Sequence, residues 1–336
     1  MDEYPMETKG RALYNLIRMN WQEDPTLPVE PWQVEDYRSL SIKDLFNRLK
    51  ALKIPLDEER FIIYGEHSTS PEELTDTLFV DEDLDQFDQV YLLVFELWRR
   101  FLPEKESLSI FCDQLDYLID LYDQEMLESE EALNDALTEL ERVLDEHTDK
   151  GEDPHTLFEE ISLYCAHDLQ SFIYDFASDQ IDQNNNLQAS EIIDGFSPYI
   201  SESRWFEFLQ LRLLAAVDPD EADVMLDRIL DEQNRNPDFE LLLEIARFLV
   251  NQGSAPNFVK VVKQARTLIE TEQDFQELLA ITCEFYRLLD REEESQKVFE
   301  ILKKRQGIPL EQEVASNDKL FKEYFRLFED LDWSEA

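Results

Sequence analysis

The residues of this chain that could bind a transition metal or act as nucleophiles are four histidines and three cysteines. Cys165 and His167 are close in sequence, but residues two positions apart on a helix point to different faces. This spacing favours neither a zinc site nor a cysteine–histidine nucleophile. We therefore expect no metal centre, and we interpret Cys112, Cys165 and Cys283 as free, buried thiols of a protein in a reducing compartment.

Two stretches show the alternating carboxylate or amide side chains of a calcium-binding EF-hand loop. In residues 81–92 a glutamine replaces the glycine that turns such a loop, and a leucine replaces the glutamate that closes it. Asp182, Asn184 and Asn186 belong to the second stretch, which has apolar residues at those two positions. We expect no calcium at either stretch, and we predict an asparagine-rich turn between two helices at the second.

Sequence signatures of common catalytic sites are missing from the chain. There is no glycine-rich phosphate loop, no Gly-x-Ser-x-Gly, no His-Glu-x-x-His and no Cys-x-x-Cys. The 78 acidic residues form close pairs by frequency alone, so their proximity does not indicate acid–base catalysis. We expect a protein that is not an enzyme and binds no cofactor. The alternative is an unfamiliar helical active site within residues 1–125, where Trp21, Tyr64, His67 and Trp98 could surround a polar pocket.

The formal net charge of −47 restricts the partners of the chain. A field of this sign repels phosphate backbones, so we expect no direct nucleic-acid binding and favour a protein partner with a basic surface or segment. A second hypothesis is an acidic protein that mimics nucleic acid and occupies a basic DNA-binding partner. Acidic residues and the lack of an apolar segment within residues 1–20 lead us to expect no secretory signal, and the densest apolar run, at 90–95, is too short for a membrane span. We therefore expect a cytoplasmic protein.

Residues that favour helices dominate the chain, and only six are glycine, which together predict an all-α fold. Three prolines predict an irregular strip at residues 22–40. Phe61–Tyr64 is the most strand-like run, and we interpret it as a buried helix or an extended linker because it has no obvious partner. Capping residues and apolar spacing predict helices at 11–19, from Ser41 to before Pro55, from Ser70 onward, at 83–101, 108–123 and 129–147, and from Asp153 to about Ile181.

A self-similarity with a period of 36 residues extends from 201 to 306. Helix starts recur at Asp218, Ser254 and Asp290. Apolar positions recur with the same period: Phe206, Leu242 and Leu278; Leu209, Ile245 and Ile281; Leu226, Val262 and Val298. One pair of amphipathic helices cannot bury its own apolar face, so neighbouring pairs must stack and share a core. We predict an N-terminal helical bundle in domain 1–125, followed in domain 126–336 by an α-solenoid of hairpins with a C-terminal capping helix.

Paired helices, a period in the mid-thirties and small residues at crossing positions resemble the tetratricopeptide-like helical-repeat superfamily over about residues 165–306. The resemblance implies a concave surface, formed by the first helix of each pair, that holds a peptide or helix of a partner. On these helices Arg247 and Asn251 are one turn apart, Arg287 is the counterpart of Asn251, and Arg212 lies in the earlier unit. We predict that these four residues bind the partner of a non-catalytic adaptor, scaffold or chaperone. The alternative is that the arginines pair with acids of the chain itself.

Overall fold

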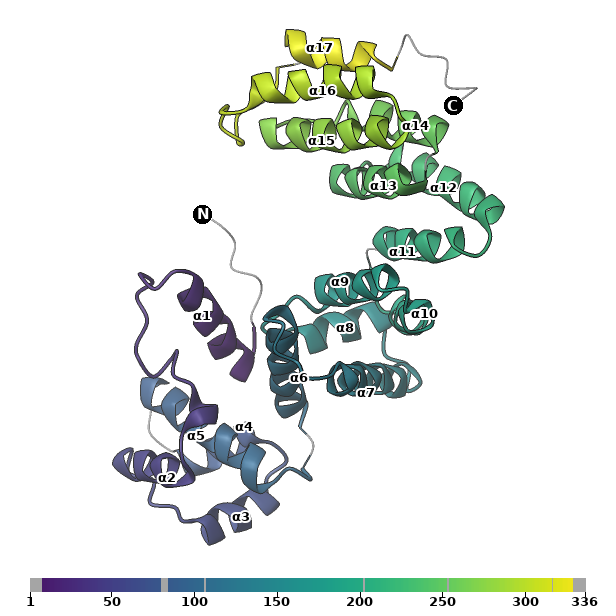
Figure 1. The fold of residues 1–336 in the computed structure, drawn as a ribbon. Coiled ribbons are helices and arrows are strands. Elements are labelled where there is room, and N and C mark those ends of the chain that lie inside the picture. Colours follow the sequence, from purple (N-terminus) through teal and green to yellow (C-terminus); the bar gives the residue numbers. More distant parts are fainter. Residues whose placement is uncertain are drawn as a thin grey trace. The chain divides into compact units, whose positions relative to one another are not determined.

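The protein is described by a computed structural model. The described residues are 8–79, 84–105, 107–201, 203–252, 254–315 and 317–328. Over these ranges the chain forms seventeen α-helices, one short 3-10 helix and no strand (Figure 1). The predicted all-α fold class is confirmed. Residues 81–83 of the first acidic stretch lie outside the described residues.

The chain forms two compact units, and each is described by itself. Unit 1 consists of residues 1–176 and 194–201, and unit 2 of residues 177–193 and 202–336. The domain boundary predicted between residues 125 and 126 lies inside unit 1.

Unit 1 is built from helices whose starts are fixed by local capping. Ser41, Ser70 and Asp153 each accept a hydrogen bond from a backbone N–H three residues later, which satisfies one free donor of the following helix. The elements are α1 (Arg11–Glu23), η1 (Tyr37–Ser39), α2 (Ile42–Ala51), α3 (Glu58–Glu66), α4 (Pro71–Leu78), α5 (Leu84–Phe101), α6 (Leu108–Asp123), α7 (Glu131–Thr148) and α8 (Pro154–Ser162), with α9 (Leu169–Asp182) and α10 (Asn186–Phe196) shared with unit 2.

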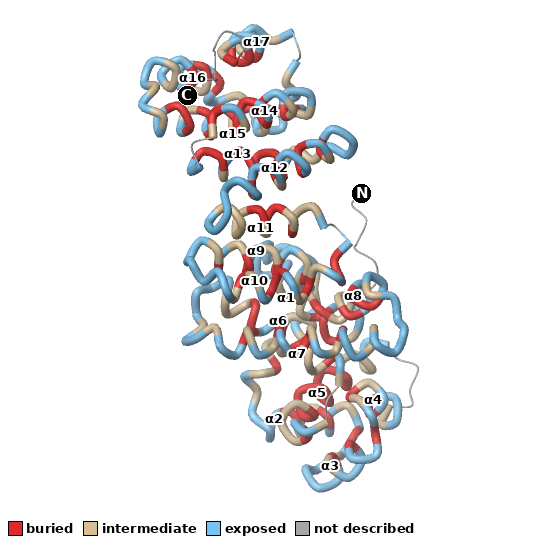
Figure 2. Tube along the Cα trace, turned by 90° about the vertical axis from the view of Figure 1, so that its right-hand side faces the viewer, coloured by how far each residue is buried: buried red, intermediate tan, exposed pale blue. Residues whose placement is uncertain are grey.

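Helix α5 lies in the core of unit 1. All nine residues from Val90 to Trp98 are buried, as expected for a stretch that is apolar on nearly every side (Figure 2). Glu96 is the charged member of this stretch, and its carboxylate accepts hydrogen bonds from Arg99 and Arg100 at 2.5 to 3.0 Å. The strand-like run Phe61–Tyr64 is helical and lies within α3, with Phe61 buried and Tyr64 exposed.

The prediction of one long helix from Asp153 to about Ile181 is wrong, because a non-helical segment separates α8 from α9. Within this segment, the backbone N–H groups of Ala166 and His167 donate to the carboxylate of Asp116 on α6, at 2.9 to 3.1 Å. The side chain of Asp168 then accepts from the N–H groups of Gln170 and Ser171 and starts α9. A buried carboxylate from another helix therefore takes the backbone donors that a continuous helix would have used.

Unit 2 contains packed helical hairpins and a final helix. The hairpins are α11 (Ser203–Ala215) with α12 (Pro219–Gln233), α13 (Phe239–Gln252) with α14 (Ala255–Ala265), and α15 (Glu272–Leu288) with α16 (Glu292–Arg305), followed by α17 (Lys319–Arg326). Asp218 and Ser254 are N-cap residues, as predicted. The third start is displaced by one residue, since Arg291 is the N-cap of α16 and Asp290 adopts a φ of 55°.

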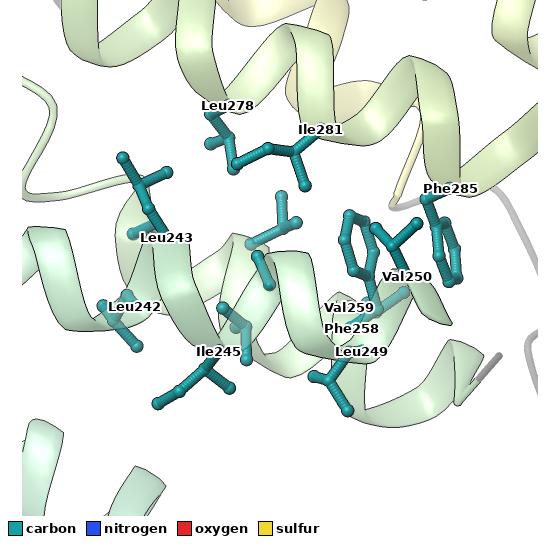
Figure 3. Close-up of a cluster of buried hydrophobic side chains, with 14 of the residues drawn as sticks. Leu242, Leu243, Ile245, Leu249, Val250, Phe258, Val259, Leu278, Ile281 and Phe285 are labelled. Carbon is teal, nitrogen blue, oxygen red and sulfur yellow. The ribbon is translucent and has the colours of Figure 1, made fainter. Parts of the chain in front are cut away.

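The hairpins of unit 2 share one apolar core. The periodic positions Leu242, Leu278, Ile245 and Ile281 are buried in it, and side chains of α13, α14 and α15 meet there (Figure 3). Phe258 of α14 stacks on Phe285 of α15 with ring centroids 3.8 Å apart. The core continues into α17, which packs against α16.

Candidate partner-binding surface

The first helices of the hairpins, α11, α13 and α15, are neighbours, because α13 packs against both of the others. Polar contacts join the corresponding helices of successive hairpins. Lys260 of α14 pairs with Asp227 of α12 at 2.8 Å, and Asn257 donates to Asp223 at 3.1 Å. These contacts link residues 33 and 34 positions apart. Successive hairpins therefore lie side by side with corresponding helices adjacent, as expected for a stack of repeats.

Arg212, a predicted partner-binding residue, is used inside unit 2. Its guanidinium donates to Ser178 at 2.6 Å and to Asp182 at 2.5 Å, and its side chain is only 14% exposed. These two hydrogen bonds link α11 to the C-terminal end of α9. Asp182 also begins the predicted asparagine-rich turn, where Asn184 has a positive φ of 64° between α9 and α10.

Arg247, Asn251 and Arg287 all lie at the surface of unit 2. Arg247 of α13 pairs with Glu244 on its own helix and with Glu277 of α15 at 3.2 Å. Arg287 pairs with Glu284 at 2.9 Å. The three predicted arginines therefore make ion pairs with acids of the chain, which is the alternative that the sequence left open.

Carboxylates outnumber cations around these arginines. We define the first-helix surface by four residues of α13 and four of α15. They are Glu240, Glu244, Arg247 and Asn251, and Gln273, Glu277, Glu284 and Arg287. Partial burial and the nearby carboxylates of Glu277, Asp274 and Asp238 raise the pKa of Glu240. The crowding of negative charge would favour a cationic side chain at this surface.

A second polar cluster, in unit 1, was missed by the sequence analysis. Asp113 of α6 accepts from Arg38 at 2.5 Å and from Arg11 at 3.4 Å, and Asn15 of α1 donates to it at 3.0 Å. A cavity of about 390 Å³ adjoins this cluster between α1, η1 and α6. Asp113 is 75, 98 and 102 positions from Arg38, Asn15 and Arg11, so no local motif could have indicated the cluster.

His167 extends the same cluster but is not placed to act as a base. Its Nδ1 lies 3.0 Å from Asp116 Oδ1 and its Nε2 lies 3.4 Å from Asp120 Oδ1, so both nitrogens face carboxylates. Burial lowers the pKa of His167, but the hydrogen bonds to Asp116 and Asp120 outweigh this effect and raise the pKa to about 9. The ring is therefore an imidazolium at neutral pH, and it joins α6 to the segment before α9.

The other residues considered for chemistry lie in separate environments. Cys112 and Cys165 are free and buried, and a hydrogen bond to Cys112, together with burial, raises the pKa of Cys165. Cys283 is only partly buried, which differs from the prediction. Trp98 lies in the core of unit 1, whereas Tyr64 and His67 are exposed.

Within the described ranges, no group of three or more histidine, cysteine or acidic side chains is arranged to hold a metal ion. None of the helices in those ranges combines the length and the apolarity that crossing a bilayer requires. A comparison with protein-family models, curated proteins and solved structures gave no match.

Proposed function

We propose that the protein is a non-catalytic adaptor, scaffold or chaperone that binds a basic segment of a protein partner on the first-helix surface of unit 2. The observation that supports this most strongly is the crowding of carboxylates around Glu240, where burial and then the carboxylates of Glu277, Asp274 and Asp238 raise the pKa. A lysine or arginine of a partner would relieve that repulsion. The arginines of the surface are already paired with Glu244, Glu277 and Glu284, so they order the carboxylates rather than attract an anion.

The stacking of the hairpins supports the same proposal. Helices α13 and α15 present their exposed side chains on adjacent rows, joined by the pair Arg247–Glu277. An extended or helical segment that lies across both rows could contact several carboxylates at once. Each exposed pair contributes about 0.2 to 1 kcal/mol, so several are needed for a specific complex.

The test uses two variants with the same change in net charge. The first replaces Glu240, Glu277 and Glu284 by glutamine. It affects the two ion pairs Arg247–Glu277 and Arg287–Glu284, which are exposed and therefore contribute little to folding. The control replaces three exposed acids elsewhere in unit 2, as Asp231→Asn, Glu300→Gln and Glu323→Gln. Both are used as bait, beside the wild-type chain, for affinity isolation with crosslinking from the native host.

We expect the wild-type chain and the control to recover the same basic partner, with crosslinks to α13 or α15, and the first variant to lose it by about tenfold. If both variants lose the partner to the same extent, only the overall charge of the chain matters. If neither variant loses it, the first-helix surface is not the binding site. If the wild-type chain recovers no defined partner at all, the proposed function is wrong.

A further inference from the structure

Unit 1 contains an apolar groove of about 710 Å³ that no part of the proposed function uses. Side chains of α6, α7 and α8 line it. These helices are neighbours in unit 1 (Figure 1). Its apolar lining includes Leu108, Phe111, Val143, Leu157, Ile161 and Tyr164. The volume lies in the range of about 300 to 1,000 Å³ that is typical of ligand sites in proteins.

The groove is open to solvent along one side. Leu108, the first residue of α6, is 36% exposed, and Arg142 on α7 is exposed as well. An occupant would therefore bury one face in the groove and keep the other in water. An amphipathic helix has this character, because its apolar residues recur every three or four positions on one face. About three turns of a helix some 10 Å wide, half sunk in the groove, fit a volume of this size.

The cations that line the groove already have partners within unit 1. Lys105 donates to three backbone carbonyl oxygens at 2.6 to 2.8 Å. Arg142 lies between Glu139 and a second glutamate of α7. The ammonium of Lys9 lies 5.6 Å from the centre of the Tyr164 ring. These groups are therefore poorly placed to attract an anionic occupant.

One carboxylate of the groove has no ion-pair partner among the described residues. Glu160 of α8 lines the groove and is exposed, and it makes no ion pair with any residue that the structure describes. The chain as a whole carries a formal net charge of −47. Both the local carboxylate and the overall field therefore favour a cationic occupant.

We infer that this groove binds an amphipathic helix of a protein partner, with apolar residues in the groove and a lysine or arginine paired with Glu160. The site belongs to unit 1 and does not depend on the first-helix surface of unit 2. The probe that tests it is a fluorescently labelled synthetic peptide of about 15 residues, with leucines on one helical face and lysines on the other.

The test separates apolar docking from simple charge attraction. Leu108→Glu and Val143→Glu each add a negative charge inside the groove, and Val224→Glu adds the same charge at an exposed position of α12. If the leucines of the peptide enter the groove, the first two variants bind it at least about tenfold more weakly, whereas Val224→Glu binds it as tightly as the wild-type chain. The binding is measured by fluorescence anisotropy on the full chain.

Leu108→Glu keeps the test valid if Val143→Glu fails to fold. A carboxylate in the first turn of α6 interacts favourably with the helix dipole, so we expect an unchanged circular dichroism spectrum and melting temperature. Undiminished binding by a folded Leu108→Glu variant would overturn the inference, because attraction would then depend on charge alone. A second result would also overturn it: both groove variants abolish the binding of a fluorescent fatty acid but leave the affinity for the peptide unchanged. The groove would then be a site for an acyl chain.

Discussion

His167 lies between two carboxylates of α6, and its charge should make the stability of unit 1 depend on pH. Its pKa is raised to about 9, above the ordinary value of about 6.5. The stabilisation from its contact with Asp116 is therefore fully present below pH 6.5, and it is lost as the pH rises through about 9.

The substitution His167→Gln tests this dependence. We expect it to lower the free energy of unfolding by about 2 kcal/mol at pH 6 and by clearly less at pH 9.5, as measured by urea denaturation. His147→Gln is the control, because that histidine contacts Glu152 in an exposed pair. A loss of the same size at both pH values for His167→Gln would contradict the assignment of the charge.

Arg305 and Glu272 form a buried ion pair in unit 2. Their side chains are 5% and 1% exposed, and the guanidinium donates two hydrogen bonds to the carboxylate at 2.5 and 2.6 Å. Removing one partner leaves the other charge buried, so Arg305→Ala should cost about 3 to 5 kcal/mol. The double variant Arg305→Ala with Glu272→Gln should recover part of this loss in urea denaturation. Equal instability of the single and double variants would show that lost packing, not the unpaired charge, sets the cost.

At the scale of elements, α17 covers the last hairpin of unit 2. The Tyr324 ring is fully buried against Phe275 and Phe328, and its hydroxyl lies 2.7 Å from Thr282 Oγ1. Tyr324→Ala should destabilise unit 2 by about 3 to 5 kcal/mol, since it removes a large core side chain. Hydrogen exchange in α15 and α16 should accelerate, whereas the exposed neighbour Glu323→Ala should leave it unchanged. Unchanged exchange in the Tyr324 variant would mean that α17 does not protect the stack.

Much of this architecture could be predicted from local sequence. Caps at Ser41, Ser70 and Asp153, and the apolar run Val90–Trp98, indicate helices with the correct starts and burial. The periodic apolar positions of the hairpins are also buried where the pattern places them, as for Leu242 and Leu278. These features are local or strictly periodic, so sequence spacing alone reveals them.

The features that escaped prediction depend on contacts between distant residues. The break between α8 and α9 is made by Asp116, which is 50 positions from the backbone N–H of Ala166. The acidic first-helix surface was hidden among 78 acidic residues, whereas the arginines that share a helix face stood out in so acidic a chain. Only the structure shows that Arg247 is paired and that Glu240 is the crowded group.

At the scale of the whole molecule, the net charge of −47 should reduce stability through self-repulsion. Raising the salt concentration from about 10 mM to 150 mM shortens the screening length from about 30 Å to 8 Å. We therefore expect the melting temperature to rise, by about 2 to 4 °C for each kcal/mol of repulsion removed. Differential scanning calorimetry at several salt concentrations measures this, and a melting temperature that stays constant or falls would contradict it.

The salt dependence of partner binding distinguishes the two binding hypotheses. A chain that mimics nucleic acid should lose its partner steeply as salt increases, because many pairs of opposite charge are screened together. Binding of a basic segment by a few carboxylates of the first-helix surface should weaken only moderately. The slope of affinity against salt therefore separates a broad acidic decoy from a localised site.

The most direct test of the proposed function is carboxylate footprinting of the full chain with and without the partner that it recovers from its host. In this measurement a carbodiimide couples an amine to accessible carboxylates, and mass spectrometry reports the extent at each residue. We expect the partner to protect Glu240, Glu277 and Glu284 and to leave Asp231 and Glu300 fully reactive. Protection that is absent from α13 and α15, or equal at all five residues, would contradict a partner-binding site on the first-helix surface.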